Sequence, residues 1–123
     1  MNMLSVALVA LLAETAGAQP HVHLKVKVGE AGDGTLDQPA LSWKGSTLHA
    51  RAVTSMTATS EVEATAPPGI TVADGTVTLC YHRRNITPPP GQMIPHWARP
   101  VLLDFTVQGL PKQDYKVSIA ECP

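Results

Sequence analysis

Strict alternation of apolar and polar residues at positions 21–28 constrains the fold of this chain more than any other feature of its sequence. Four aliphatic side chains recur at every second position and share one face of an extended chain, while two histidines and two lysines share the other. A period of two over eight residues is typical of a half-buried strand. Eleven prolines in 123 residues argue against long helices, because proline lacks an amide donor and clashes inside a helix. The sequence therefore favours an all-β fold.

Several later segments carry comparable patterns. Predicted strands cover residues 47–53, 57–66, 70–72, 76–81, 101–107 and 115–120. With residues 21–28 they make about seven strands, the number and spacing expected of an antiparallel β-sandwich. Gly75 closes a three-residue connection, which predicts a hairpin over residues 70–81. Residues 83–100 are predicted to be an irregular loop, because so many prolines exclude both helix and central strand.

Residues 1–18 match a secretory signal peptide. An uncharged apolar run at positions 3–13 is followed by Ala16, Gly17 and Ala18, a small-residue cleavage pattern. The run is shorter than the roughly 20 apolar residues that span a bilayer. We expect a cleavable signal helix, a single domain over residues 19–123, secreted or periplasmic localisation and no stable membrane insertion after cleavage. A buried N-terminal helix is the alternative, since no Lys or Arg precedes the run.

Two cysteines, Cys80 and Cys122, are present. In an exported chain an even number of cysteines predicts a disulfide. Cys80 lies in a predicted strand and Cys122 ends the last one, so the bridge would tie the final strand to an earlier one. In the chain-entropy model, a disulfide that closes the loop from Cys80 to Cys122 stabilises the fold by about 4 kcal/mol.

The C-terminal residues resemble the closing hairpin of immunoglobulin-like and fibronectin-type-III-like domains. Residues 101–107 form a strand pattern that leads into Leu110 and Pro111, and then into Tyr115 at the start of the next strand. This arrangement is similar to the tyrosine corner of those domains. The resemblance implies that the Tyr115 ring covers the end of the core and that its hydroxyl bonds to backbone near Leu110. It implies a fold and no particular function.

Composition argues against two classes of function. The chain contains nine Lys and Arg and ten Asp and Glu, and loss of Glu14 with the signal peptide would make the two numbers equal. A chain without excess positive charge has no long-range electrostatic attraction for nucleic acid. The sequence contains neither the Gly-x-Ser-x-Gly pattern of serine hydrolases nor a phosphate-binding P-loop. We therefore expect a protein that is not an enzyme and does not bind nucleic acid.

The loop at positions 83–99 is the predicted contact surface for an unidentified protein or envelope partner. Tryptophan and arginine are frequent hot spots of interfaces, and loops on a rigid sandwich often bind partners. The candidate binding residues are Arg83, Arg84, Met93, His96, Trp97 and Arg99. In the plainer interpretation, Trp97 packs onto the open end of the core. A binding or structural module is the leading hypothesis, and an enzyme inhibitor or accessory subunit is a weaker one.

The histidines support an alternative function in metal binding. His21 and His23 are two positions apart on a predicted strand and therefore face the same side. Two such imidazoles can bind one copper or zinc ion, with His82, His96 or Met93 as a third ligand if the fold brings one near. In the simpler interpretation, His21 and His23 lie on a solvated polar face of the strand and bind no cofactor.

Overall fold

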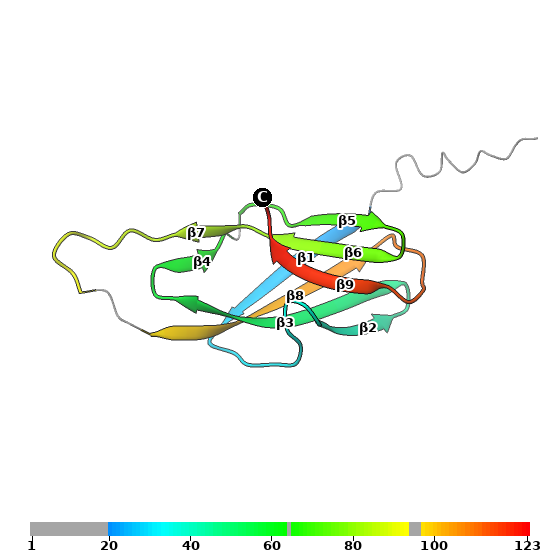
Figure 1. Ribbon diagram of the computed structural model, residues 1–123, viewed down its shortest axis with the longest axis horizontal. Helices are drawn as coiled ribbons and strands as arrows, with labels where there is room; N and C mark the ends of the chain where they lie inside the picture. The colour runs from blue at the N-terminus through cyan, green and yellow to red at the C-terminus, as the bar shows by residue number, and fades with distance from the viewer. Residues whose placement is uncertain (1–19, 64, 94–96) are drawn as a thin grey trace, which may run out of the picture.

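The structure, a computed structural model, describes residues 20–63, 65–93 and 97–123. Within these ranges it contains nine strands and no helix, so the all-β prediction is confirmed (Figure 1). A four-stranded sheet has the order β1 (His21–Val28), β8 (Ala98–Gln108), β3 (Thr47–Thr57) and β2 (Ala40–Lys44). A three-stranded sheet has the order β5 (Gly69–Ala73), β6 (Thr76–Tyr81) and β9 (Lys116–Glu121), and β4 (Ser60–Val62) pairs with β7 (Arg83–Asn85).

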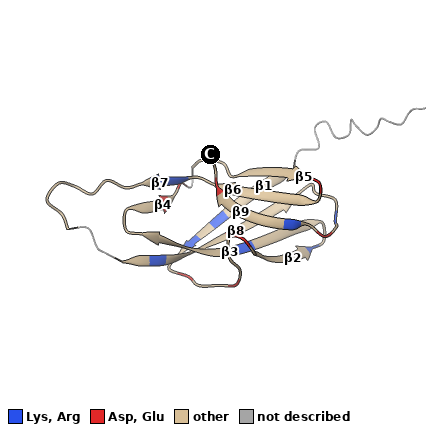
Figure 2. Ribbon diagram, viewed as in Figure 1, with Lys and Arg blue, Asp and Glu red and all other residues tan. Residues whose placement is uncertain are grey.

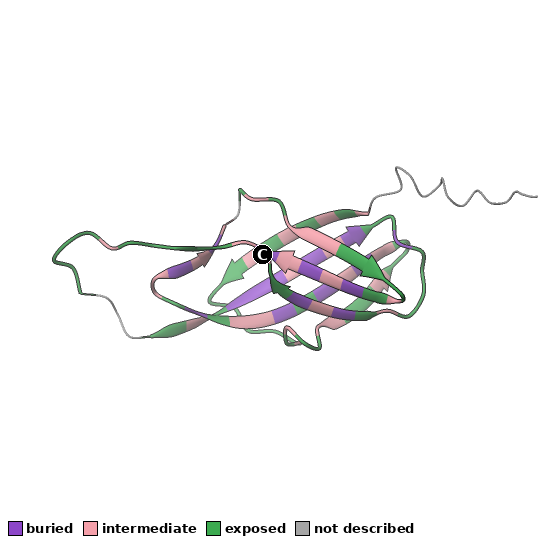
Figure 3. Cartoon of the chain, turned by 45° about the horizontal axis from the view of Figure 1, so that its top comes forward, coloured by how far each residue is buried: buried purple, intermediate pink, exposed green. Residues whose placement is uncertain are grey.

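The core lies between the two larger sheets. Alternate residues of β8 point inward, and the register places Phe105 opposite Ala50 and Leu103 opposite Ala52 of β3. The two alanines leave room for their larger partners, so this pair of strands fills the centre without overcrowding. Buried residues of β6 and β9, including Val77, Leu79, Val117 and Ile119, complete the same cluster, and the stripes of buried residues are visible in Figure 3.

The connection between β1 and β2 joins the two sheets. The Gly34 carbonyl accepts a hydrogen bond from Val53 N of β3 at 3.1 Å, and the Leu36 carbonyl accepts one from Ile119 N of β9 at 2.8 Å. Leu36 also packs against the core. Gly34 has a φ of +92°, and a Cβ there would collide with the Arg51 carbonyl oxygen, so only glycine fits. This connection therefore closes one side of the molecule.

Strand patterns in the sequence predict most of these elements and miss two, β2 and β7. The alternation at β1 is confirmed, although Val28 is 58 % exposed because it ends an edge strand. The hairpin over residues 70–81 is confirmed, but its turn is only Asp74 and Gly75, both with positive φ. Strand β2 was not predicted, the 57–66 prediction shrinks to β4, and residues 83–85 and 98–100 of the predicted loop are strand.

The predicted closing hairpin is wrong. Strands β8 and β9 belong to different sheets, and the segment between them crosses from one sheet to the other. Strand β9 pairs with β6 in parallel, so the prediction of a wholly antiparallel sandwich is also wrong at this edge. The predicted tyrosine hydrogen bond is nevertheless present: the Tyr115 hydroxyl donates to the Pro111 carbonyl at 2.6 Å, and its ring packs against the core.

The predicted disulfide joins Cys80 to Cys122, with Cα atoms 4.9 Å apart. Cys80 lies on β6 and Cys122 follows β9, so the bridge links neighbouring strands of one sheet. The Cys122 amide donates to the Tyr81 carbonyl at 2.7 Å beside it. Gly69 lies opposite Cys80 in the register, and a Cβ at position 69 would approach Cys80 Sγ to 2.7 Å. The disulfide thus leaves no room for a side chain at Gly69.

We predict that Gly69→Ala lowers the free energy of unfolding by about 1–3 kcal/mol, because the added methyl must displace the disulfide. In a background with Cys80→Ala and Cys122→Ala, the same substitution is expected to change stability by less than about 0.5 kcal/mol. Urea denaturation of the four proteins measures this difference. An equal loss in both backgrounds would contradict the role assigned to the disulfide.

We predict that Tyr81 makes the folded protein less stable in alkaline solution. Burial, aided by the negative charge of Glu121 opposite it on β9, raises the pKa of the Tyr81 phenol. The folded protein therefore holds this proton above pH 10, where the unfolded chain has released it, and stability falls as the pH rises through that range. Urea denaturation between pH 8 and 11 should show a smaller loss for Tyr81→Phe than for wild type. Parallel losses would refute the assignment.

Candidate functional site

Residues 86–93 follow β7 and project from the sheets at the left of Figure 1, and Trp97 lies directly before β8. Residues 86–93 and Trp97 are together called the arm. Of the predicted contact residues, Met93 lies on the arm and Trp97 ends it. Arg99 lies on β8, whereas Arg83 and Arg84 lie on β7. His96 falls outside the described residues. The structure thus brings only part of the predicted set together.

Apolar side chains surround a hollow of about 320 Å³ at the base of the arm. Met93 is 94 % exposed, and Trp97 is 48 % exposed. The hollow is lined chiefly by Thr59, Ile86, Pro88, Pro89, Met93 and Trp97. The plainer interpretation of the sequence was that Trp97 packs onto the open end of the core. The exposure of its side chain shows that it does not.

Arg99 fixes the wall of the hollow. Its guanidinium donates hydrogen bonds to the Ser60 carbonyl at 3.2 Å and to the Thr57 carbonyl at 3.4 Å. Its Cζ atom lies 5.3 Å from the centroid of the Trp97 ring, within the range of a cation–π interaction. The Arg99 side chain therefore connects the turn between β3 and β4 to the tryptophan.

The two arginines of β7 are occupied by ion pairs. Arg83 Nε lies 3.4 Å from a Glu121 carboxylate oxygen. Arg84 Nε donates to Glu61 at 2.7 Å, and Arg84 also lies 3.8 Å from Glu63. The hydrogen bond to Glu61 and its negative charge raise the pKa of the Arg84 guanidinium. These groups brace β7 against β4 and β9 and do not line the apolar hollow.

The structure places His21 and His23 on β1, both exposed and directed to the same side of the sheet. His82 lies between β6 and β7, and Met93 lies on the arm. Within residues 20–63, 65–93 and 97–123, no group of three or more His, Cys, Asp or Glu side chains is arranged to hold a metal ion. The third ligand that a copper or zinc site would need is therefore not found among these residue types in those ranges.

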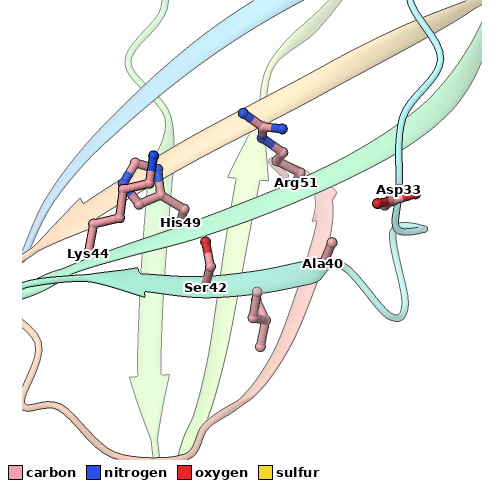
Figure 4. A pocket seen from close by; sticks show the side chains of 7 residues that line it. Asp33, Ala40, Ser42, Lys44, His49 and Arg51 are labelled. Atoms are coloured by element: carbon pink, nitrogen blue, oxygen red, sulfur yellow. The ribbon is translucent and has the colours of Figure 1, made fainter.

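A second hollow, of about 310 Å³, opens on the outer face of the four-stranded sheet. It is lined by Asp33, Ala40, Leu41, Ser42, Lys44, His49 and Arg51 (Figure 4). Sequence reasoning missed it because β2, which supplies four of these residues, was not predicted. The alternation of Leu41 and Trp43 with Ser42 and Lys44 in β2 was the available signal.

Comparison of the chain with protein-family models, curated proteins and solved structures finds no match to any of them. In the part of the chain that the structure describes, no helix is long and apolar enough to cross a membrane. The functional argument therefore rests on the surfaces of the chain itself.

We predict that Arg99→Ala loosens Trp97 and lowers the free energy of unfolding by about 1 kcal/mol, since it removes two hydrogen bonds and the cation–π contact. Acrylamide quenching of Trp97 fluorescence, measured with Trp43→Phe in every protein, should increase. Arg99→Lys keeps the charge and should change quenching less. Quenching that is unchanged in Arg99→Ala would contradict this role.

Proposed function

We propose that this chain is an exported immunoglobulin-like β-sandwich that acts as a binding or structural module, with the loop of residues 83–99 as its contact surface. Two sheets around one core and the Tyr115 hydrogen bond to Pro111 support the immunoglobulin-like assignment. The parallel pairing of β6 with β9 distinguishes the chain from antibody domains.

The exposed apolar hollow of the arm is the observation that carries this proposal. Ile86, Met93 and Trp97 are all exposed, although each is large and apolar, and they converge on one hollow. Apolar groups gathered at one place on a surface mark interaction sites more reliably than single exposed ones do. A tryptophan held by an arginine is also the kind of anchor that dominates binding energy at interfaces. A partner with an apolar protrusion would fill this hollow.

Contacts with the sheets anchor the two described ends of the arm. Its start is fixed where the Ile86 amide donates to the Thr59 carbonyl at 2.7 Å, and its end joins the long pairing of β8 with β3. Pro88 and Pro89 restrict the backbone between these points. Binding through such a loop loses less conformational entropy than binding through a free chain would. The arm thus suits recognition of a partner.

Export is supported by two separate features. Residues 1–18 carry the signal pattern, and Cys80 and Cys122 are bonded, as cysteines commonly are in the periplasm and outside the cell. An exported chain meets envelope or extracellular proteins, which are therefore the class of partner that we propose. An enzyme inhibitor or accessory subunit would use the same hollow.

Photocrosslinking from the arm tests the proposal. A benzophenone amino acid at position 93, in cells that export the chain, should form an adduct of defined mass with one partner. The matched control is the same group at Val72, which is exposed on β5, away from the hollow. Trp97→Ser together with Ile86→Ser should reduce the adduct at least about tenfold, because both walls of the hollow are lost. Equal adducts from positions 93 and 72, or an adduct insensitive to these substitutions, would overturn the proposal.

A further inference from the structure

The outer faces of the two larger sheets differ in charge. On the four-stranded sheet, β1 contributes Lys25 and Lys27, β2 contributes Lys44 and β3 contributes Arg51. Figure 2 marks the Lys and Arg positions of the whole chain in blue, among them bands on β7 and β9. The outward residues of the three-stranded sheet are mostly small or uncharged, with Lys116 as their charged member. Four of the nine Lys and Arg of the chain thus lie on the outer face of the four-stranded sheet, here called the basic face, and the other five lie elsewhere.

Strand register aligns polar groups in rows across this basic face. One row runs through Ser42, His49, Thr106 and His23, which are successive partners on β2, β3, β8 and β1. Neighbouring strands lie about 4.8 Å apart, so the members of a row are close neighbours. The row contains two imidazoles and two hydroxyls, and all of these groups can donate hydrogen bonds.

The next row contains the one carboxylate at the middle of the face. Asp104 of β8 lies between Lys25 and Arg51, and its Oδ2 is 3.6 Å from Arg51 Nε. The Asp104 side chain is 15 % exposed, whereas that of Arg51 is 55 % exposed. The ion pair therefore engages one edge of the guanidinium and leaves its terminal nitrogens accessible.

The hollow of about 310 Å³ lies where these rows meet β2. Figure 4 shows the side chains of Ser42, Lys44, His49 and Arg51 directed to the same side of β2 and β3. An ammonium, an imidazole, a guanidinium and a hydroxyl thus border one space. Asp33, from the connection before β2, borders the opposite end and is the only acidic residue among the described residues that line the hollow.

We infer that this hollow binds the phosphate group of a phosphate ester. The donors come from two neighbouring strands and line one hollow, and a phosphate offers more acceptor oxygens to several donors than a carboxylate does. About 10–15 Å³ of such space holds one water molecule, so a phosphate fills only part of the hollow. The rest accommodates the esterified group, either a small polyol or a lipid headgroup.

This site is separate from the arm. Strand β2 lies toward the right of Figure 1 and the arm projects to the left, and the two hollows share no lining residue. The inference does not depend on the proposed contact surface, and a substitution that lines one hollow removes no residue that lines the other.

Titration of the ¹⁵N-labelled full chain with sn-glycerol 3-phosphate at constant ionic strength tests the inference. Saturable shifts are expected at residues 40–44 and 49–51. Lys44→Gln and His49→Gln should each weaken binding about tenfold, because each removes a charge-assisted hydrogen bond. Asp33→Asn should tighten binding by removing a like charge. Lys116→Gln, which removes an exposed lysine from the other sheet, is the matched control and should bind as wild type does.

Two further probes distinguish the source of the phosphate. Inorganic phosphate should shift the same residues with lower affinity. Sedimentation with phosphatidylglycerol vesicles that is lost in Lys44→Gln would assign the site to a lipid headgroup, and binding of glycerol phosphate without vesicle binding would assign it to a soluble ester. Absence of saturable shifts with glycerol phosphate, or a loss in Lys116→Gln as large as that in Lys44→Gln, would overturn the inference.

Discussion

The pairing of β8 with both β1 and β3 is the constraint on which the rest of the structure depends. Because side chains alternate along an extended strand, this register decides at once which residues enter the core and which face solvent. It buries Phe105 and Leu103 over the two alanines of β3. It also sets Asp104 between two basic groups on the opposite face. A slip of one residue would exchange the two faces, so the core and the basic surface are specified together.

Sequence patterns predict where strands lie in the chain better than they predict which strands pair with one another. The long alternating strands and the hairpin at Asp74 and Gly75 were predictable because their signals are local. The parallel pairing of β6 with β9 was not, since it depends on contacts between segments far apart in the chain. Strand β7 contains no apolar residue, and β2 is only five residues long, so neither shows a period over enough residues to be recognised. The prediction of an antiparallel closing hairpin was therefore wrong, although the tyrosine hydrogen bond predicted from the same sequence pattern is present.

The same distinction applies to the candidate sites. The arm was predictable because its prolines, Met93 and Trp97 lie close together in sequence. The ion pairs of Arg83 and Arg84 were not predictable, because their partners Glu121 and Glu61 come from other strands. The basic hollow combines residues of β2 and β3 with Asp33, and only the fold unites them. One end of the molecule thus presents apolar groups, and one face presents hydrogen-bond donors for an anion.

The position of β9 has a consequence for the cooperativity of folding. This strand supplies Val117 and Ile119 to the core as well as the parallel partner of β6. Its Ile119 amide also donates to the Leu36 carbonyl, in the connection between β1 and β2. Without β9 the core lacks one wall and β6 loses one of its two neighbours. The two sheets therefore complete their packing in one step, when β9 docks.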